Sequence, residues 1–289
     1  MKVGLAIGDY SWPSGPSHLG PELAAVAKAA DDSGFDSLWV MDHFFQIPNF
    51  GAVEEPMLEA YGALSYAAAL TSRVTLGALV TGAVYREPGL LVKQVSTLDA
   101  LSGGRAVLGI GAGWYEAEAR GLGLRFPPLA ERFERLEETL QIARQMGSEE
   151  DKPYEGRHYT LERTLNAPQA RPPILIGGSG EKKTLRLVAE YADACNFLQG
   201  ADVRHKLGVL RAHCERLGRP YEEIEKTLHL RIPDGQSVKE SVRQCGGLAA
   251  LGIDHVIVAV PDAAAGSSLA HLAALAEQIA AITPAGRAR

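Results

Sequence analysis

The chain has few of the features that mark secreted, metal-binding or membrane proteins. Only three of its 289 residues are cysteines, Cys195, Cys214 and Cys245, and none lies in a C-x-x-C pair or a Cys/His cluster. This spacing disfavours a disulfide framework and a zinc site, so we expect buried thiols in a reducing cytoplasm and no metal. No apolar run approaches the roughly 18 residues that a membrane-spanning helix needs.

An excess of charge of one sign is also missing. The formal net charge is −6, with 29 Lys and Arg against 35 Asp and Glu. Such a balance gives no general attraction to nucleic acid or to an acidic membrane surface, and we expect neither as a partner. Hydrophobic residues make up 46% of the chain, which is typical of a globular protein with a large core.

Strand-like and helix-like segments alternate along most of the chain. We predict eight strands, at 3–8, 37–41, 74–80, 106–111, 173–178, 192–197, 226–232 and 255–260. We predict helices at 21–34, 57–71, 89–104, 129–146, 181–192, 202–217, 236–251 and 264–281. The first turn, "GDYSWPSGP", lacks the G-x-G-x-x-G of an open dinucleotide-binding sheet. The pattern therefore predicts an α/β fold, a (β/α)8 TIM barrel, with residues 1–289 as one domain.

One segment, 147–172, interrupts the alternation. It is polar, contains proline and shows no helical period. We predict an irregular excursion with one hairpin in "YEGRHYTL". Together with the aromatic loop 44–56, we expect it to shape an apolar substrate pocket, although the loop's aromatic side chains would equally suit packing or an interface.

The carboxyl ends of barrel strands meet at one face, where catalytic groups collect. The second strand ends in "WVMDHFF", which places Asp42 and His43 at that face. We predict that His43 transfers a proton or orients a ring, the alternative being a simple strand cap. The glycines of "GIGAGW" (109–114) allow either a flat ligand or a tight turn.

Other polar residues near the strand ends leave alternatives open. Thr81 and Gly82 look like loop residues, and Arg86 suits an anion site or a structural ion pair equally well. Glu116 and Glu118 have the chemistry of acid–base groups, but exposed glutamates are usually solvated.

A glycine-rich loop in "ILIGGSGEKKTLRL" (174–187) opens a predicted helix. Free backbone N–H groups at such a point form an anion site, to which the Ser179 hydroxyl adds a donor. Lys182, Lys183 and Arg186 fall in the first turns, where cations oppose the helix dipole. Their placement is easiest to explain if an anionic ligand binds there, against the alternative of a solvated charged face.

These motifs together resemble the bacterial luciferase-like family, and within it the actinobacterial coenzyme F420-dependent oxidoreductases. The resemblance rests on "SLWVMDHFF", "VTLGALVTGAVYREPGLLVKQVSTLDALSGGRAVLGIGAGWYEAEARGLG" and "PPILIGGSGEKKTLRLVAEYADACNF", in this order, with "FPPLAERFERLEETLQ" and "LGIDHVIVAV" in support. It implies a TIM barrel that carries a deazaflavin or flavin at its mouth, often as a homodimer. His43 is the catalytic residue that the resemblance implies, and the residues implied at the cofactor are Asp42, Ala78, Leu79, Val80, Thr81, Gly113, Trp114, Gly177, Gly178, Ser179, Lys182 and Lys183. The segment 78–81 matches a bulge where many relatives have a non-prolyl cis peptide.

Two departures from the family pattern bear on the substrate. Sugar-phosphate dehydrogenases of the family have a catalytic glutamate where this chain has Trp114, and the usual "RHP" or "RNP" is "REP" at 86–88. The leading hypothesis is therefore an F420-dependent oxidoreductase that acts on an unidentified, apolar small molecule. The alternatives are an FMN-dependent monooxygenase and a non-catalytic deazaflavin-binding protein.

Overall fold

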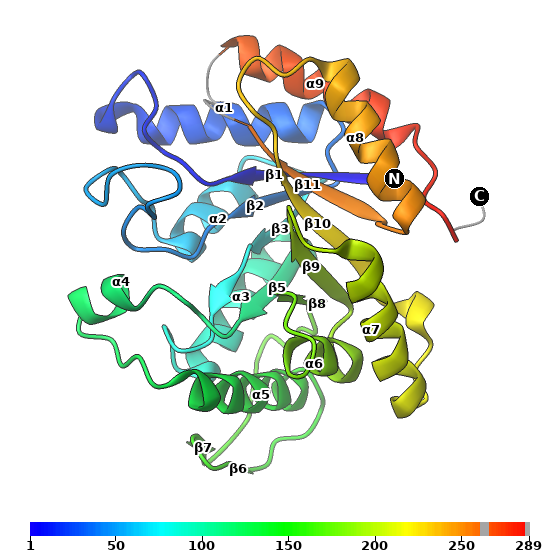
Figure 1. Cartoon of the computed structure of the whole chain (residues 1–289). Helices are drawn as coiled ribbons and strands as arrows, with labels where there is room; N and C mark the ends of the chain where they lie inside the picture. Colours follow the sequence, from blue (N-terminus) through cyan, green and yellow to red (C-terminus); the bar gives the residue numbers. More distant parts are fainter. Residues whose placement is uncertain (261–265, 287–289) are drawn as a thin grey trace.

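Eight parallel strands close into a barrel in the computed structural model, which describes residues 1–260 and 266–286 (Figure 1). The barrel strands are β1 (Lys2–Ile7), β2 (Ser37–Val40), β3 (Thr75–Ala78), β5 (Ala106–Gly111), β8 (Ile174–Gly177), β9 (Ala194–Leu198), β10 (Glu225–Arg231) and β11 (His255–Ala259). Their order is β3-β2-β1-β11-β10-β9-β8-β5, and a parallel pairing of β3 with β5 closes the ring. The predicted (β/α)8 TIM barrel is confirmed, while the single-domain boundary at 1–289 stays a prediction.

Helices cover the outside of the barrel. They are α1 (Leu19–Asp32), α2 (Ala60–Ala68), α3 (Pro88–Ser102), α4 (Glu116–Gly121), α5 (Leu129–Met146), α6 (Thr184–Tyr191), α7 (Val203–Leu217), α8 (Val238–Leu251) and α9 (Gly266–Ala280), with short 3-10 turns η1 (Pro16–His18) and η2 (Tyr221–Glu223). The α2 helix starts three residues later than predicted because Glu59 caps it, its carboxylate accepting the Gly62 N–H at 2.6 Å. The predicted start of the last helix, at 264, lies outside the described residues.

Residues of each barrel strand alternate between the helices and the barrel interior. In β1, Val3, Leu5 and Ile7 belong to the core beneath the helices, whereas Ala6 joins the interior group around Trp39. Glycines make room for this indole: a Cβ on Gly77 would lie 2.6 Å from its Cζ3 atom. The interior is therefore filled by a large side chain packed against backbone.

The excursion at 147–172 contains the predicted hairpin, formed by β6 (Tyr154–Glu155) and β7 (Thr160–Leu161). Tyr159 packs with Val92 of α3 and with Ile142 and Met146 of α5. Figure 1 shows the hairpin beyond α5, on the outer side of the barrel. The apolar side chains of the hairpin, Tyr154, Tyr159 and Leu161, thus pack against α3 and α5, and a part for the excursion in shaping the substrate pocket stays a prediction.

No helix within residues 1–260 and 266–286 is both long and apolar enough to cross a bilayer.

Candidate functional site

The carboxyl ends of the barrel strands, which we call the mouth, gather four segments. They are the loop after β2, the bulge after β3, the region from the end of β5 through α4, and the loop after β8. In Figure 1 the β2 loop and α4 both lie beyond the arrowheads of the strands, while the N-terminus lies at the opposite end. The residues that the resemblance implies at the cofactor fall in these segments or at the strand ends directly before them, but they do not all face the same way.

Asp42 points into the protein. Its carboxylate is covered, accepts two hydrogen bonds from Arg86 at 2.8 and 2.9 Å, and takes the Gly82 N–H at 3.2 Å. Burial raises the pKa of Asp42, and the Arg86 contacts oppose that shift. Arg86 also pairs with Glu59 at 2.5 Å, so of the two alternatives for Arg86 the structural ion pair is the one observed. Asp42 thus holds Arg86 and the Gly82 backbone in place at the mouth. Its predicted contact with a cofactor stays a prediction.

His43 turns toward the mouth and is held by a carboxylate. Its Nδ1 lies 2.6 Å from Oε1 of Glu118, in α4. The imidazole keeps 11% of its side chain exposed, and its ring lies edge-on to Trp114 and Tyr115, with centroids 5.5 and 5.9 Å away. A proton-transferring group at this place would be both oriented and accessible.

Glu118 is fully buried, contrary to the expectation that it is solvated. Its carboxylate also accepts the Tyr85 hydroxyl at 2.6 Å and the N–H groups of Phe44 and Phe45 at 2.8 and 3.3 Å. Burial alone would raise the pKa of Glu118, but the bonds from His43 and Tyr85 lower it below its ordinary value. The group is therefore a carboxylate at neutral pH, and only His43 Nδ1–H can supply the hydrogen of the short contact.

Sequence reasoning left the roles of Glu116 and Glu118 open, because exposed glutamates are usually solvated; in the structure Glu116 is exposed and Glu118 is buried. Trp114 precedes α4, so a helical spacing from the indole gave no signal that Glu118 is buried. Tyr85 carried no signal at all, since its role depends on Glu118.

Trp114 and Gly113 lie at the edge of the mouth. The indole is 57% exposed and stacks on Tyr115, with ring centroids 5.1 Å apart. Gly113 has φ 74°, a conformation that favours glycine, and its carbonyl accepts a hydrogen bond from Arg132. An exposed indole beside His43 offers a flat apolar wall to a substrate.

The four residues of the bulge divide into two pairs. Leu79 and Val80 pack with the interior group, and the peptide bond between them is cis, as the resemblance implied. Ala78 belongs to the core under the helices, and Thr81 is buried with its hydroxyl 2.8 Å from that of Tyr61. Thr81 and Gly82, expected in a loop, form the short strand β4 (Thr81–Gly82), because β5 offers them a parallel partner.

Val80 faces two glycines across the mouth. A Cβ on Gly177 would lie 2.8 Å from Val80 Cγ2, and one on Gly111 would lie 3.0 Å from the same atom. Larger residues at either position would displace the valine. The result is a surface of backbone and one β-branched side chain, on which a flat ring can lie closely.

The loop after β8 is more open than predicted. Gly178 donates its N–H to Asn196 at 3.0 Å, but in the part of the chain that is described the N–H groups of Ser179 and Gly180 make no hydrogen bond. The α6 helix begins at Thr184, so Lys182 and Lys183 precede it rather than occupy its first turn. Both lysines are exposed, with Lys183 Nζ 5.2 Å from the Phe133 ring.

Arg186 does not serve this loop. Its guanidinium pairs with Glu137 at 2.5 Å and with Glu190 at 2.6 Å. The expectation that it joins an anion site was wrong, since two neighbouring carboxylates already neutralise it.

The aromatic residues of loop 44–56 are used partly for packing. Phe50 touches Gly8, where a Cβ would lie 2.9 Å from the ring, and the Arg231 guanidinium lies 4.9 Å from its centroid. Phe45 lies against Gly121 of α4. The loop thus reaches from β2 toward β10, along one side of the mouth.

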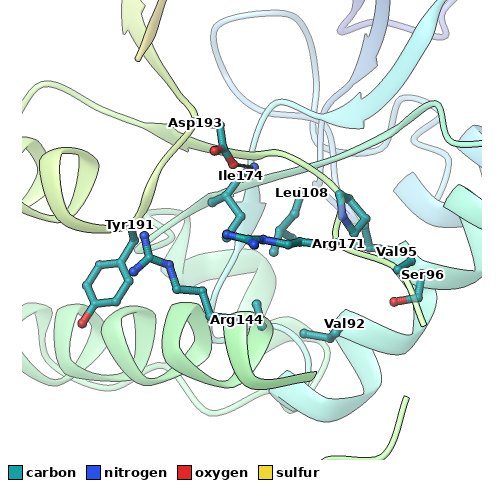
Figure 2. Close-up of a pocket in the computed structure, with 12 residues that line it drawn as sticks. Val92, Val95, Ser96, Leu108, Arg144, Arg171, Ile174, Tyr191 and Asp193 are labelled. Atoms are coloured by element: carbon teal, nitrogen blue, oxygen red, sulfur yellow. Dashed lines mark hydrogen bonds between the residues drawn. The ribbon is translucent and has the colours of Figure 1, made fainter. Parts of the chain in front are cut away.

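Two cavities lie away from the mouth. One of ≈ 40 Å³ is enclosed by α3, α5 and the start of β8, with Arg144, Arg171 and Asp193 in its wall (Figure 2). It has room for only one or a few water molecules. A hollow of ≈ 320 Å³ lies at the amino ends of β10 and β11, where Lys226 and Asp254 pair at 3.6 Å. Within the described ranges no three His, Cys, Asp or Glu side chains are grouped to hold a metal ion.

Known proteins resemble this chain both in sequence and in fold. A "F420-dependent glucose-6-phosphate dehydrogenase" of Kineococcus radiotolerans is 32% identical over 218 residues, 73% of this chain and 63% of the relative. A protein of the same name from Microbacterium testaceum is 30% identical over 251 residues, which cover 83% of this chain and 73% of the relative. The solved structure of an F420-dependent secondary alcohol dehydrogenase superposes with a TM-score of 0.82 at 16% identity, covering 96% of this chain and 98% of that one, which supports the fold.

The chain spans 63% of the length of the Kineococcus relative, so its activity does not follow from that name alone. Residues 11–281 match the family described as "Luciferase-like monooxygenase". This chain belongs to the luciferase-like monooxygenase family.

Proposed function

We propose that the protein is an oxidoreductase that uses coenzyme F420 to exchange a hydride with a small, apolar organic substrate. The observation that carries the proposal is the accessible His43, held by Glu118 at the edge of a glycine-lined mouth. The relatives from Kineococcus and Microbacterium, both named as F420-dependent, support the choice of cofactor.

The residues of the mouth fit a flat, anionic cofactor. Val80, with Gly111 and Gly177 opposite, would support one face of the ring. The unbonded N–H groups of Ser179 and Gly180 would receive a phosphate. Lys182, which forms no ion pair among the described residues, would meet further negative charge, with Lys183 beside it.

When bound, coenzyme F420 would supply the hydride chemistry, which no side chain provides. The chain contributes position and a proton site. His43 Nε2 would exchange the proton that accompanies hydride transfer, and Trp114 would form one wall of the substrate site and exclude water.

Glucose 6-phosphate, on which the named relatives act, is not the substrate that we propose. Trp114, 57% exposed, stands where a catalytic glutamate is expected in sugar-phosphate dehydrogenases. An indole beside His43 favours an apolar group over a sugar hydroxyl or a phosphate.

A binding titration of the full chain with coenzyme F420 and with FMN, followed by the fluorescence of each ring, tests the cofactor. We expect F420 to bind the more tightly, and Ser179→Asp to weaken binding at least about tenfold through charge repulsion. Ser148→Asp, the same charge change at an exposed position in the excursion, is the matched control. Preference for FMN would favour the monooxygenase alternative, and F420 binding without turnover would favour a deazaflavin-binding protein.

We also propose that the protein is a cytoplasmic homodimer. Leu90 and Leu101 of α3 are 58% and 73% exposed, which gives this helix apolar surface that a second copy could cover. Light scattering of the purified chain that gave the mass of a monomer would contradict the dimer, and cell fractionation tests the location.

A further inference from the structure

Glu118 is a carboxylate buried at the mouth beside the partly exposed imidazole of His43. It is 0% exposed and accepts four hydrogen bonds, from His43, Tyr85, Phe44 and Phe45. A buried carboxylate is costly unless it is fully hydrogen-bonded, and this one is.

The two oxygens of Glu118 have different partners. Oε2 takes the backbone N–H groups of Phe44 and Phe45 and so fixes the start of the loop after β2. Oε1 takes the side chains of His43 and Tyr85. A role limited to holding the loop would need Oε2 alone, which leaves the short contact of Oε1 with Nδ1 unexplained.

That contact fixes where the imidazole hydrogen sits. Because the Glu118 carboxylate accepts hydrogen bonds but cannot donate them, neutral His43 must carry its hydrogen on Nδ1. Nε2 is then the basic nitrogen, and among the described residues it has no hydrogen-bond partner. The edge-on rings of Trp114 and Tyr115 restrict rotation of the imidazole, so Nε2 keeps its direction.

We infer that Glu118 is a positioning residue that holds His43 as the Nδ1–H tautomer, with Nε2 presented to the substrate. This inference rests on the proposed function. When a proton passes from the substrate to Nε2, Nδ1–H stays bonded to Glu118, and the new positive charge forms beside a fixed negative one. In the reverse direction the same proton returns from Nε2 to the substrate, and Glu118 exchanges no proton in either case.

The test is the tautomer of His43 in the full chain, labelled with ¹⁵N-histidine and observed by long-range ¹H–¹⁵N correlation at about pH 8, where a free imidazole is neutral. His43→Gln assigns the signal. We expect the Nδ1–H pattern in the wild type. In Glu118→Gln the amide oxygen would keep the Phe44 and Phe45 N–H groups, the amide NH₂ would face Nδ1, and His43 would change to the Nε2–H tautomer.

Tyr85→Phe is the matched control, because it removes the other donor to Oε1 and should leave the Nδ1–H pattern in place. An Nε2–H pattern in the wild type would overturn the inference, as would an unchanged pattern in Glu118→Gln. The wild-type result needs no variant, so a variant that fails to fold leaves the test intact.

These measurements separate the inference from the proposed function. The tautomer is read without cofactor or substrate, whereas the F420 titration reads the cofactor site alone. A chain that shows Nδ1–H but binds no F420 would keep the inference about Glu118 and refute the proposed cofactor.

Discussion

A histidine–glutamate pair stands at each end of the barrel, and the two are built for different purposes. At the mouth, His43 Nδ1 lies 2.6 Å from Glu118. At the opposite end, His255 Nδ1 lies 3.5 Å from Glu225, which also pairs with Lys2 at 3.0 Å. We call this second group, with Ser37 and Trp39, the floor network.

The difference lies in the second nitrogen of each imidazole. His255 Nε2 lies 3.0 Å from the Ser37 hydroxyl, which in turn accepts the Trp39 indole N–H at 2.7 Å. Both nitrogens of His255 are therefore occupied, and the residue is 4% exposed. His43 has one nitrogen bonded, and in the part of the chain that the structure describes the other has no hydrogen-bond partner. The same two residue types make a closed structural group at the floor and a reactive one at the mouth.

The largest effect that we expect is on the free energy of unfolding, and it comes from the floor network. Burial alone would raise the pKa of Glu225, but His255 and Lys2 lower it to about 2. A lowered carboxyl pKa adds stability that is present above the ordinary value near 4.5 and is lost as the pH falls toward 2, here about 3 kcal/mol. We expect Glu225→Gln to lose a free energy of unfolding of that order at pH 7 and to show a flatter decline in acid, measured by urea unfolding.

Glu116→Gln is the control for this prediction, because Glu116 is an exposed glutamate whose one ion pair within residues 1–260 and 266–286 is with Arg120 on the surface. Equal losses in the two variants, or an unchanged acid profile in Glu225→Gln, would mean that the floor network contributes no more than a surface ion pair.

Two glycines sharpen the same comparison. A methyl group on Gly77 would lie 2.6 Å from the Trp39 ring and 3.0 Å from the Val107 carbonyl, so Gly77→Ala should lower the free energy of unfolding by about 2 kcal/mol. A methyl group on Gly177 would push Val80 toward the proposed cofactor, and Gly177→Ala should weaken F420 binding about tenfold. Thermal unfolding and F420 titration of both variants check that Gly77→Ala mainly lowers stability and that Gly177→Ala mainly weakens F420 binding. If Gly77→Ala weakened F420 binding and Gly177→Ala did not, the cofactor would lie elsewhere.

The two imidazoles should differ in reactivity. Diethyl pyrocarbonate acylates an accessible, unprotonated imidazole nitrogen, which His43 offers and His255 does not. We expect His43 to react at least about ten times faster, a difference of about 1.4 kcal/mol in activation free energy, as read by peptide mass mapping over time. Comparable rates would show that the floor opens as readily as the mouth.

The fold was largely predictable because its signals are local. The strand predicted at 106–111 and the helix predicted at 129–146 have those bounds in the structure, since each depends on the period of its own apolar residues. Asp42 and His43 were placed at the mouth by the same logic. What local patterns could not give was the direction of each side chain, and the structure separates these neighbours, turning Asp42 inward and His43 outward.

The residues that were missed depend on distant partners. Glu118 is buried because β2 ends next to α4, and it lies 75 residues from His43. Thr81 and Gly82 form a strand only because β5 is beside them. Arg186 was assigned to an anion site because its charge was visible in the sequence, whereas its partner Glu137 lies on another helix, 49 residues away. A sequence shows which residues are charged, but the packing of the chain decides which of these charges pair with each other.

The smallest expected effect concerns the difference between a paired and an unpaired cation near the loop after β8. Lys182 has no ion pair in the described part of the chain, so Lys182→Ala should weaken F420 binding by about threefold, with a difference that shrinks as salt rises from 50 to about 500 mM. Arg186→Ala removes a cation of equal charge a few residues away, but one that Glu137 and Glu190 already neutralise. It should leave F420 affinity within about twofold and cost at most about 1 kcal/mol in the free energy of unfolding. If Arg186→Ala weakened binding more than Lys182→Ala did, the anionic part of the cofactor would lie over α6, and the loop after β8 would not be its site.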